Sequence, residues 1–194
     1  DRTADLAREQ GARVVFEPVN QIARARNTGA AAASGDWLLF IDADSRPSRG
    51  LFSDVAAQIG PDRCLGGGST VRFDKQTLLL RLLENSWNLL SRTLVLAAGS
   101  FIFCQAAAFH EIRGFSPELF ASEEIDFSRR LKRLAKREGK RMVILHRHPL
   151  LTSARRVELY SIREHLNLLA RVMVRPRKTL KGGSAHLPWY DGRR

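Results

Sequence analysis

Asp36-Trp37-Leu38-Leu39-Phe40-Ile41-Asp42-Ala43-Asp44-Ser45-Arg46-Pro47 is an apolar run that stops at two carboxylates separated by one residue. Consecutive apolar residues between turn formers are typical of a strand buried on both faces. Asp42 and Asp44 then lie at its carboxyl end, where ligands bind in open α/β sheets. Carboxylates there are hard ligands for a divalent cation, Mn²⁺ or Mg²⁺, that carries phosphates. The alternative is that they only cap a helix expected from Ser48.

Apolar periodicity on both sides of this stretch predicts an α/β fold with a mostly parallel central sheet flanked by helices. Strands are expected over residues 12–16, 37–41, 63–73, 99–104 and 141–145, and helices over 1–11, 20–34, 48–59, 76–96, 105–112, 123–138 and 157–174. The His146-Arg147-His148-Pro149 run would follow the last strand at its carboxyl end. The leucine-rich stripe of the helix over 76–96 is typical of a face packed on the core.

Length and composition indicate one domain. A chain of 194 residues with 44% hydrophobic content suffices for a single α/β unit, here a core over about residues 1–145 with a basic helical extension over 146–194. Cys64 and Cys104 are too few for a disulfide framework or a zinc site, so both are expected to be reduced core residues of a cytoplasmic protein. The apolar runs are too short for a membrane span.

Charge is concentrated near the carboxyl terminus. Residues 1–128 hold 13 basic and 16 acidic side chains, whereas residues 129–194 hold 19 basic and 4 acidic ones. Such a basic region can meet the phosphates of a nucleotide, an anionic membrane surface or nucleic acid, or it can be a solvated face. The basic segment lacks the interleaved aromatic residues of a nucleic-acid stacking surface, which makes nucleic acid the least favoured partner.

Two blocks of sequence resemble one known family. The segment ARNTGAAAASGDWLLFIDADSRP, residues 25–47, is similar to the central segment of family 2 glycosyltransferases, which have the Rossmann-like nucleotide-diphospho-sugar transferase (GT-A) fold. The second block, 114–131, resembles the turn of that family that precedes a Glu-Asp-x-Asp helix. The resemblance covers about residues 1–145. It implies that the first strand, first helix and second strand of the fold are absent, so part of the nucleotide-base pocket is expected to be missing.

The resemblance also implies roles for individual residues. Asp42 and Asp44 would hold the metal, with His148 as a further ligand, and Arg26, Asn27 and Asp42 would contact the nucleotide sugar. Glu124 stands where the family has its catalytic Asp and would be the general base, with Glu123 and Asp126 beside it; which of Glu123 and Glu124 acts stays open, as does a purely helix-capping role for the acidic cluster. Arg155 and Arg156 would pair with the diphosphate, or they are surface charges.

The expected activity is metal-dependent, inverting transfer of a sugar from a nucleotide diphosphate to an acceptor hydroxyl. The expected acceptors include lipid-linked ones, and the protein is expected to attach peripherally to the inner face of a membrane. The resemblance also implies contact with lipid as an alternative for the leucine-rich stripe over 76–96. The alternatives are a nucleotidyltransferase of similar fold and a non-catalytic basic module that binds an anionic membrane surface.

Overall fold

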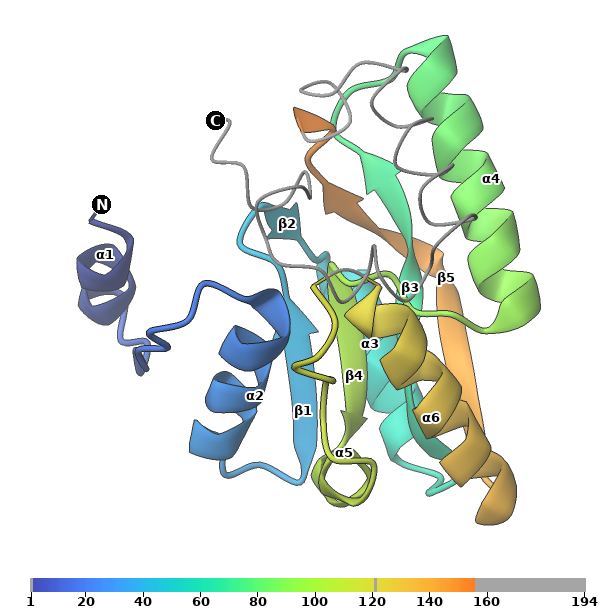
Figure 1. Ribbon diagram of the computed structural model, residues 1–194. Helices are drawn as coiled ribbons and strands as arrows, with labels where there is room; N and C mark the ends of the chain where they lie inside the picture. The colour runs from blue at the N-terminus through green and yellow to red at the C-terminus, as the bar shows by residue number, and fades with distance from the viewer. Residues whose placement is uncertain (1, 121, 156–194) are drawn as a thin grey trace.

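The computed structural model describes residues 2–120 and 122–155. Arg156 and the helix expected over 157–174 lie outside the described residues. The described elements, labelled in Figure 1, are α1 (Thr3–Glu9), α2 (Ile22–Ala32), β1 (Trp37–Ile41), β2 (Ser45–Arg46), α3 (Arg49–Ile59), β3 (Cys64–Phe73), α4 (Leu78–Leu94), β4 (Phe101–Gln105), α5 (Ala106–Glu111), α6 (Glu123–Arg137) and β5 (Arg141–Thr152).

The sheet is mixed, which corrects the expectation of a mostly parallel one. Its described strands run in the order β1-β4-β3-β5-β2, and only the β3–β5 pair is parallel. β4 is antiparallel to both of its neighbours, with Leu39 opposite Phe103 on one side and Gly67 opposite Phe103 on the other. The α/β class and the flanking helices are as predicted.

Glycines in β3 allow the strands to approach closely. A Cβ atom at Gly67 would lie 2.0 Å from the Val143 carbonyl oxygen of β5, and one at Gly66 would lie 2.4 Å from the Phe103 carbonyl oxygen of β4. Gly66 also has φ +155°, which favours glycine. The glycine run of this strand is therefore explained by backbone packing.

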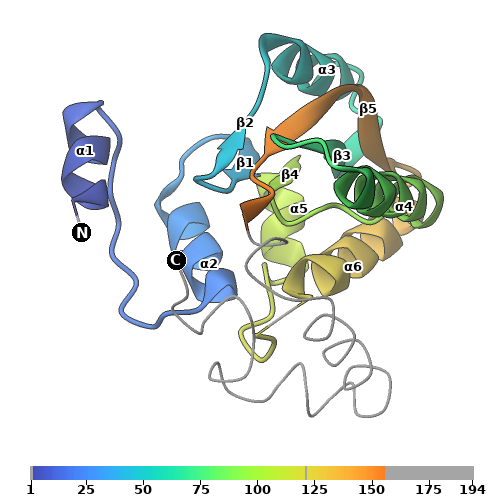
Figure 2. The same cartoon turned by 90° about the horizontal axis from the view of Figure 1, so that it is seen from above.

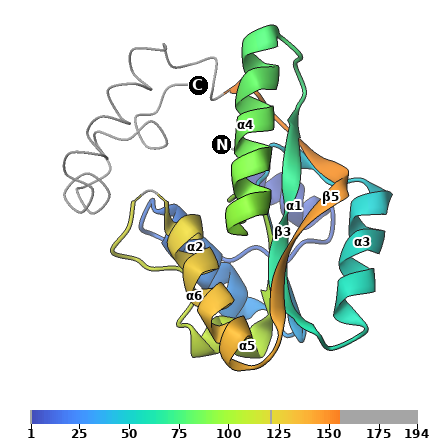
Figure 3. The same ribbon diagram turned by 90° about the vertical axis from the view of Figure 1, so that its right-hand side faces the viewer.

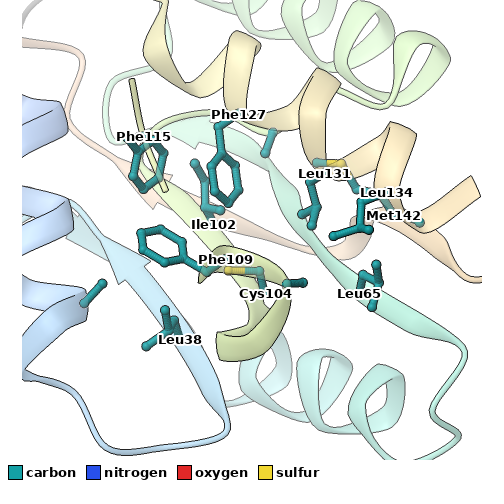
Figure 4. Packing of buried hydrophobic residues seen from close by; sticks show 14 of the residues in the cluster. Leu38, Leu65, Ile102, Cys104, Phe109, Phe115, Phe127, Leu131, Leu134 and Met142 are labelled. Atoms are coloured by element: carbon teal, nitrogen blue, oxygen red, sulfur yellow. The ribbon is translucent and has the colours of Figure 1, made fainter. Parts of the chain in front are cut away.

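The core has one cluster on each face of the sheet. Along β4 the side chains alternate, so that Phe101 and Phe103 pack with α3 while Ile102 and Cys104 pack with α2, α5 and α6. Figure 4 shows the second cluster, in which the rings of Phe115 and Phe127 stack with centroids 4.5 Å apart. Figure 3 shows α3 on one side of the sheet and α6 on the other.

Both cysteines belong to this core, as predicted. Cys64 and Cys104 are buried and unpaired. Burial raises the pKa of both thiols, that of Cys104 to about 12, which suits inert core residues.

Two strand predictions are wrong. Residues 12–16 form no strand, and Phe16 is 85% exposed, because this segment lies away from the sheet between α1 and α2 (Figure 2). β5 continues past Leu145 to Thr152, so that His146 and His148 lie within the strand and not beyond its end. β1 lies where it was predicted but is not buried on both faces: Leu39 and Ile41, which share one face, are 39% and 38% exposed.

The long helix α4 is oriented opposite to expectation. Its inward face buries Leu80 and Ser91 and makes polar contacts with β3: the Asn88 side chain exchanges two hydrogen bonds with the Val71 backbone, and Glu84 accepts one from the Phe73 N–H. Its outward face carries leucines that are 44% to 77% exposed: Leu78, Leu79, Leu82, Leu83, Leu89, Leu90 and Leu94. We call these residues the leucine face. These polar contacts satisfy backbone hydrogen-bonding groups at the carboxyl end of β3. The apolar side of α4 therefore faces away from the sheet and is not covered by the described residues.

Candidate active site

The two carboxylates at the end of β1 lie in a turn that the backbone holds in place. The Asp42 N–H donates to the Ser100 carbonyl (3.2 Å), and the Ser45 N–H donates to the Asp42 carbonyl (3.0 Å). Ser45 then begins β2 and pairs with Thr152 of β5. Ser48, through its Oγ, is the N-cap of α3, so neither aspartate has the capping role considered above. Asp42 is partly buried and Asp44 is exposed.

Arg26 joins this turn to the second sequence block. Its Nη2 donates to Asp42 Oδ1 (3.1 Å) and to the Gly99 carbonyl (2.8 Å), and its Nη1 donates to Glu123 Oε1 (3.0 Å). The Arg26 side chain is 11% exposed and that of Glu123 is 6% exposed. The guanidinium therefore forms ion pairs with carboxylates from β1 and α6 at the same time.

Asn27, the next residue of α2, clamps the turn before α6. Its Nδ2 donates to the Phe115 carbonyl (2.8 Å), and its Oδ1 accepts from the Phe115 N–H (2.9 Å). Gly114 has φ +59°, and a Cβ there would lie 2.6 Å from Asn27 Oδ1, so this turn requires glycine. Phe115 in turn lies under Arg26, whose Cζ is 5.2 Å from the ring centroid.

Glu123 and Glu124 form a coupled carboxyl pair at the start of α6. Burial, and then the neighbouring Glu123 carboxyl, raise the pKa of Glu124 to about 7. Burial also raises the pKa of Glu123, although the Arg26 charge opposes that shift. At neutral pH, Glu124 can therefore either hold or accept a proton.

The other candidate residues are placed differently. Asp126 Oδ2 accepts from Arg130 Nε (2.7 Å) within α6, and His148 Nδ1 lies 2.9 Å from Asp54 Oδ2 of α3. The described residues contain no group of three or more His, Cys, Asp or Glu side chains that could hold a metal, so His148 is not brought to the aspartates. Arg155 is exposed. It lies three residues after Thr152, which pairs with Ser45, the residue that follows Asp44.

The residues present nevertheless fit a divalent metal of the Mg²⁺ or Mn²⁺ type. Such ions are commonly held by one or two carboxylates together with substrate phosphates and water. Asp42 and Asp44 are two oxygen-donor side chains in a backbone-fixed turn, and Asp44 is open to solvent. A ligand phosphate would complete the shell.

A groove of about 520 Å³ runs between α2 and β1 and ends at Arg26, Asp42 and Ala43. Most of its lining is apolar and comes from Ile22, Ala25, Gly29, Ala30, Ala33, Trp37, Leu38, Leu39, Phe40 and Ile41. The groove places apolar surface beside the charged end of the site.

Sequence reasoning missed Gly99, whose carbonyl accepts from Arg26. A Cβ there would lie 3.2 Å from Arg26 Nη2 and 3.7 Å from Glu124 Cγ. The only sequence signal was a Gly-Ser pair before the β4 strand, and such a pair does not indicate contacts with Arg26 or Glu124.

The model of the family described as glycosyl transferase family 2 matches residues 1–113. A search of curated proteins found no match.

Three solved structures with a similar fold illustrate the likeness. A mannosyltransferase from Pyrobaculum calidifontis, in complex with GDP-mannose and Mn²⁺, has TM-score 0.61 and 14% identity over 92% of this chain and 55% of its own. Staphylococcus aureus TarS has TM-score 0.58 and 15% identity over 96% of this chain and 55% of its own. Glucosyl-3-phosphoglycerate synthase from Mycobacterium tuberculosis has TM-score 0.57 and 18% identity over 94% of this chain and 65% of its own.

This chain thus spans about half to two thirds of the length of those structures, and the likeness shows that its fold is GT-A. Because the family model covers more than half of the sequence, the chain belongs to glycosyl transferase family 2.

Proposed function

We propose that this protein is a metal-dependent, inverting glycosyltransferase that moves a sugar from a nucleotide diphosphate to an acceptor hydroxyl. The observation that carries the proposal is the Arg26 bridge, which puts the strand-end aspartate and the Glu123–Glu124 pair into one site. Solved structures of this fold include complexes with GDP-mannose or UDP-glucose and Mn²⁺, which supports a nucleotide-sugar donor.

In this proposal Glu124 is the general base. Its carboxylate accepts the acceptor's hydroxyl proton as that oxygen attacks the anomeric carbon, and the bond to the diphosphate oxygen breaks on the opposite side. A single displacement inverts the configuration. A pKa near 7 suits this role, because the group is substantially ionised at neutral pH and still basic enough to take the proton.

The leaving diphosphate needs positive charge. A divalent metal held by Asp42 and Asp44 would supply Lewis-acid stabilisation of the leaving group. Arg155, and Arg156 outside the described residues, are proposed to pair with the diphosphate, since the chain leaves the sheet beside the Asp44 turn. Glu123, which accepts a hydrogen bond from Arg26, is proposed to orient the neighbouring Glu124.

The test is binding of Mn²⁺ with a panel of nucleotide sugars, followed by calorimetry on Asp44→Ala. We expect metal-dependent donor binding that this variant abolishes while the fold is kept, because Asp44 lies in an exposed turn. Asp36→Ala is the matched control: it removes an exposed carboxylate next to the other end of β1 and should bind like the wild type. Unchanged Mn²⁺-dependent binding in Asp44→Ala contradicts the metal site.

The alternative functions predict different substrates, products and effects of substitution. A nucleotidyltransferase would consume a nucleoside triphosphate and a sugar phosphate and release pyrophosphate, which a glycosyltransferase does not. A non-catalytic basic module would tolerate loss of Asp42, Asp44 and Glu124 without any change in its binding.

We further propose that the protein attaches peripherally to an anionic membrane through the leucine face, and that lipid-linked hydroxyls are among its acceptors. No helix among the described residues is long and apolar enough to cross a membrane. The leucine face is an apolar surface on an amphipathic helix, as in helices that lie in a membrane interface.

The charges near the leucine face fit an anionic surface. α4 carries exposed Arg81 and Arg92, and its single acid, Glu84, is bonded to the Phe73 N–H. Lys132 of α6 donates to the Leu94 carbonyl at the end of α4 (2.7 Å). Because α4 leads directly into the Gly99 loop that contacts Arg26, attachment there would bring the active site near the lipid surface.

Vesicle co-sedimentation tests this attachment. We expect binding to vesicles that contain anionic lipid, weaker binding to neutral ones, and screening by salt. Leu82→Gln/Leu89→Gln should lose most of the binding, whereas Leu6→Gln, at an exposed leucine of α1, should not. Absence of binding, or a dimer in light scattering that the double variant dissociates, would show that lipid is not the partner of this face.

A further inference from the structure

We infer that Arg26 is a positioning residue, which holds the Asp42 and Glu123 carboxylates in one geometry and restrains metal binding at Asp42 until an anionic diphosphate arrives. The inference rests on the proposed function and concerns how its site is assembled. It differs from the expectation that Arg26 contacts the nucleotide.

The first argument is that three of the five Arg26 N–H donors are already engaged. Nη1 is bound to Glu123, and Nη2 is bound to both Asp42 and the Gly99 carbonyl. The ring of Phe115 lies against the same guanidinium. A nucleotide contact would have to replace bonds that are largely shielded from water, which is costly for the carboxylate left behind.

The second argument is that the partners come from separate parts of the fold. Asp42 follows β1, Gly99 precedes β4 and Glu123 begins α6. A planar guanidinium can bond to several acceptors in fixed directions, whereas a lysine ammonium is a point charge on a flexible stem. Arg26 therefore fixes the position of the metal-binding carboxylate relative to the carboxyl pair of α6.

The third argument concerns charge. A guanidinium within 3.1 Å of Asp42 Oδ1 already neutralises that carboxylate, so a divalent cation binding there meets the repulsion of a fixed positive charge. The negative charge of a diphosphate offsets this repulsion. Metal and diphosphate should therefore bind cooperatively, with weak binding of the metal alone.

Gly99 makes this arrangement possible. A Cβ atom there would lie 3.2 Å from Arg26 Nη2, which is tighter than an ordinary contact. Gly99→Ala should therefore displace the guanidinium without changing any charge. This substitution separates the geometry of Arg26 from its charge.

The experiment measures Mn²⁺ binding by electron paramagnetic resonance, with and without a nucleoside diphosphate, and measures kcat and KM for the donor. For Arg26→Gln we expect Mn²⁺ alone to bind about tenfold tighter or more, because a nearby positive charge is lost, and kcat to fall while the donor KM changes little. Arg26→Lys keeps the charge, so its Mn²⁺ affinity should stay near wild type while kcat falls. Gly99→Ala should resemble Arg26→Lys.

Arg24→Gln is the matched control. Arg24 lies on the same helix, is exposed and bonds only to Gln21 among the contacts described, so its variant removes one charge from α2 without touching the site. If Arg26→Gln raises the donor KM and leaves kcat and Mn²⁺ affinity unchanged, Arg26 is a nucleotide contact and the inference is wrong. If Arg26→Gln does not fold, wild-type kcat in both Arg26→Lys and Gly99→Ala would overturn it.

Failure of the proposed function gives a different result. In that case the wild type itself shows no diphosphate-dependent Mn²⁺ binding and no transfer with any donor. Wild-type binding and transfer, together with variants that behave like Arg24→Gln, would refute the positioning role alone.

Discussion

Replacing Glu124 by Gln tests the carboxyl pair at the start of α6 through stability, without any assumption about substrate. Burial and the Glu123 carboxyl raise the pKa of Glu124 from 4.5 to about 7 in the folded protein. The folded state therefore binds the proton more tightly than the unfolded chain. This linkage stabilises the fold fully below pH 4.5, and the contribution is lost as the pH rises through about 7.

The size of the effect follows from the shift. Each pKa unit corresponds to about 1.4 kcal/mol, so the wild type should lose about 3 kcal/mol of unfolding free energy across this range. Glu124→Gln keeps the shape but cannot ionise, so it lacks this loss. Urea unfolding at pH values between about 4.5 and 8 should show the two proteins diverging as the pH rises, with the variant the more stable at the alkaline end.

Activity gives the second measurement on the same variant. In the wild type, turnover should rise with pH to a plateau above about 7, because only ionised Glu124 can accept a proton. In Glu124→Gln this rise of turnover with pH should be absent. Its turnover should fall by a factor of about 10² to 10⁴, with little change in donor affinity. Parallel stability curves would refute the raised pKa. An inactive Glu123→Gln together with an active Glu124→Gln would reverse the assignment of the base.

Three substitutions test the framework of the site, each by urea unfolding. Asn27→Ala should cost about 2–3 kcal/mol, since the Phe115 N–H and carbonyl both lose their partner, and a neutral result would mean that water replaces the amide. Ser48→Ala should cost about 1 kcal/mol through loss of the α3 N-cap, and no loss would show that the cap is weak. Gly67→Ala should prevent folding, because its Cβ would meet Val143 of β5, and a stable variant would contradict the close strand approach.

Sequence patterns predicted most elements but not their pairing. The β1 strand, the turn with Asp42 and Asp44 and most helices lie where periodicity and turn residues placed them. The prediction of a mostly parallel sheet was wrong because an apolar run indicates that a strand is buried but does not indicate in which direction the strand runs. β4 is as apolar as a parallel strand, yet it runs antiparallel to both neighbours. Strand direction is decided by the crossover connections, which periodicity does not show.

The leucine stripe of α4 shows a different limit. Amphipathicity predicts which residues share a face, but not which face meets the protein. Here the ends of β3 need hydrogen-bond partners, and Asn88 and Glu84 provide them, so the polar side turns inward. Only the structure could reveal that demand, because it arises from backbone groups of a strand that precedes the helix.

Adjacent residues of α2 explain why the two sequence blocks occur together. Arg26 bonds the carboxylates of Asp42 and Glu123, while Asn27 bonds the backbone of Phe115 in the turn that leads to α6. The side chains of the first block are thus the hydrogen-bond partners of the second. The family resemblance predicts that both residues contact the nucleotide sugar. The observed contacts of Asn27 instead hold the turn at Phe115 in place. Loss of Asn27 should therefore affect the chemistry through the position of Glu124, even though the bonds of Asn27 to the described residues are to the Phe115 backbone.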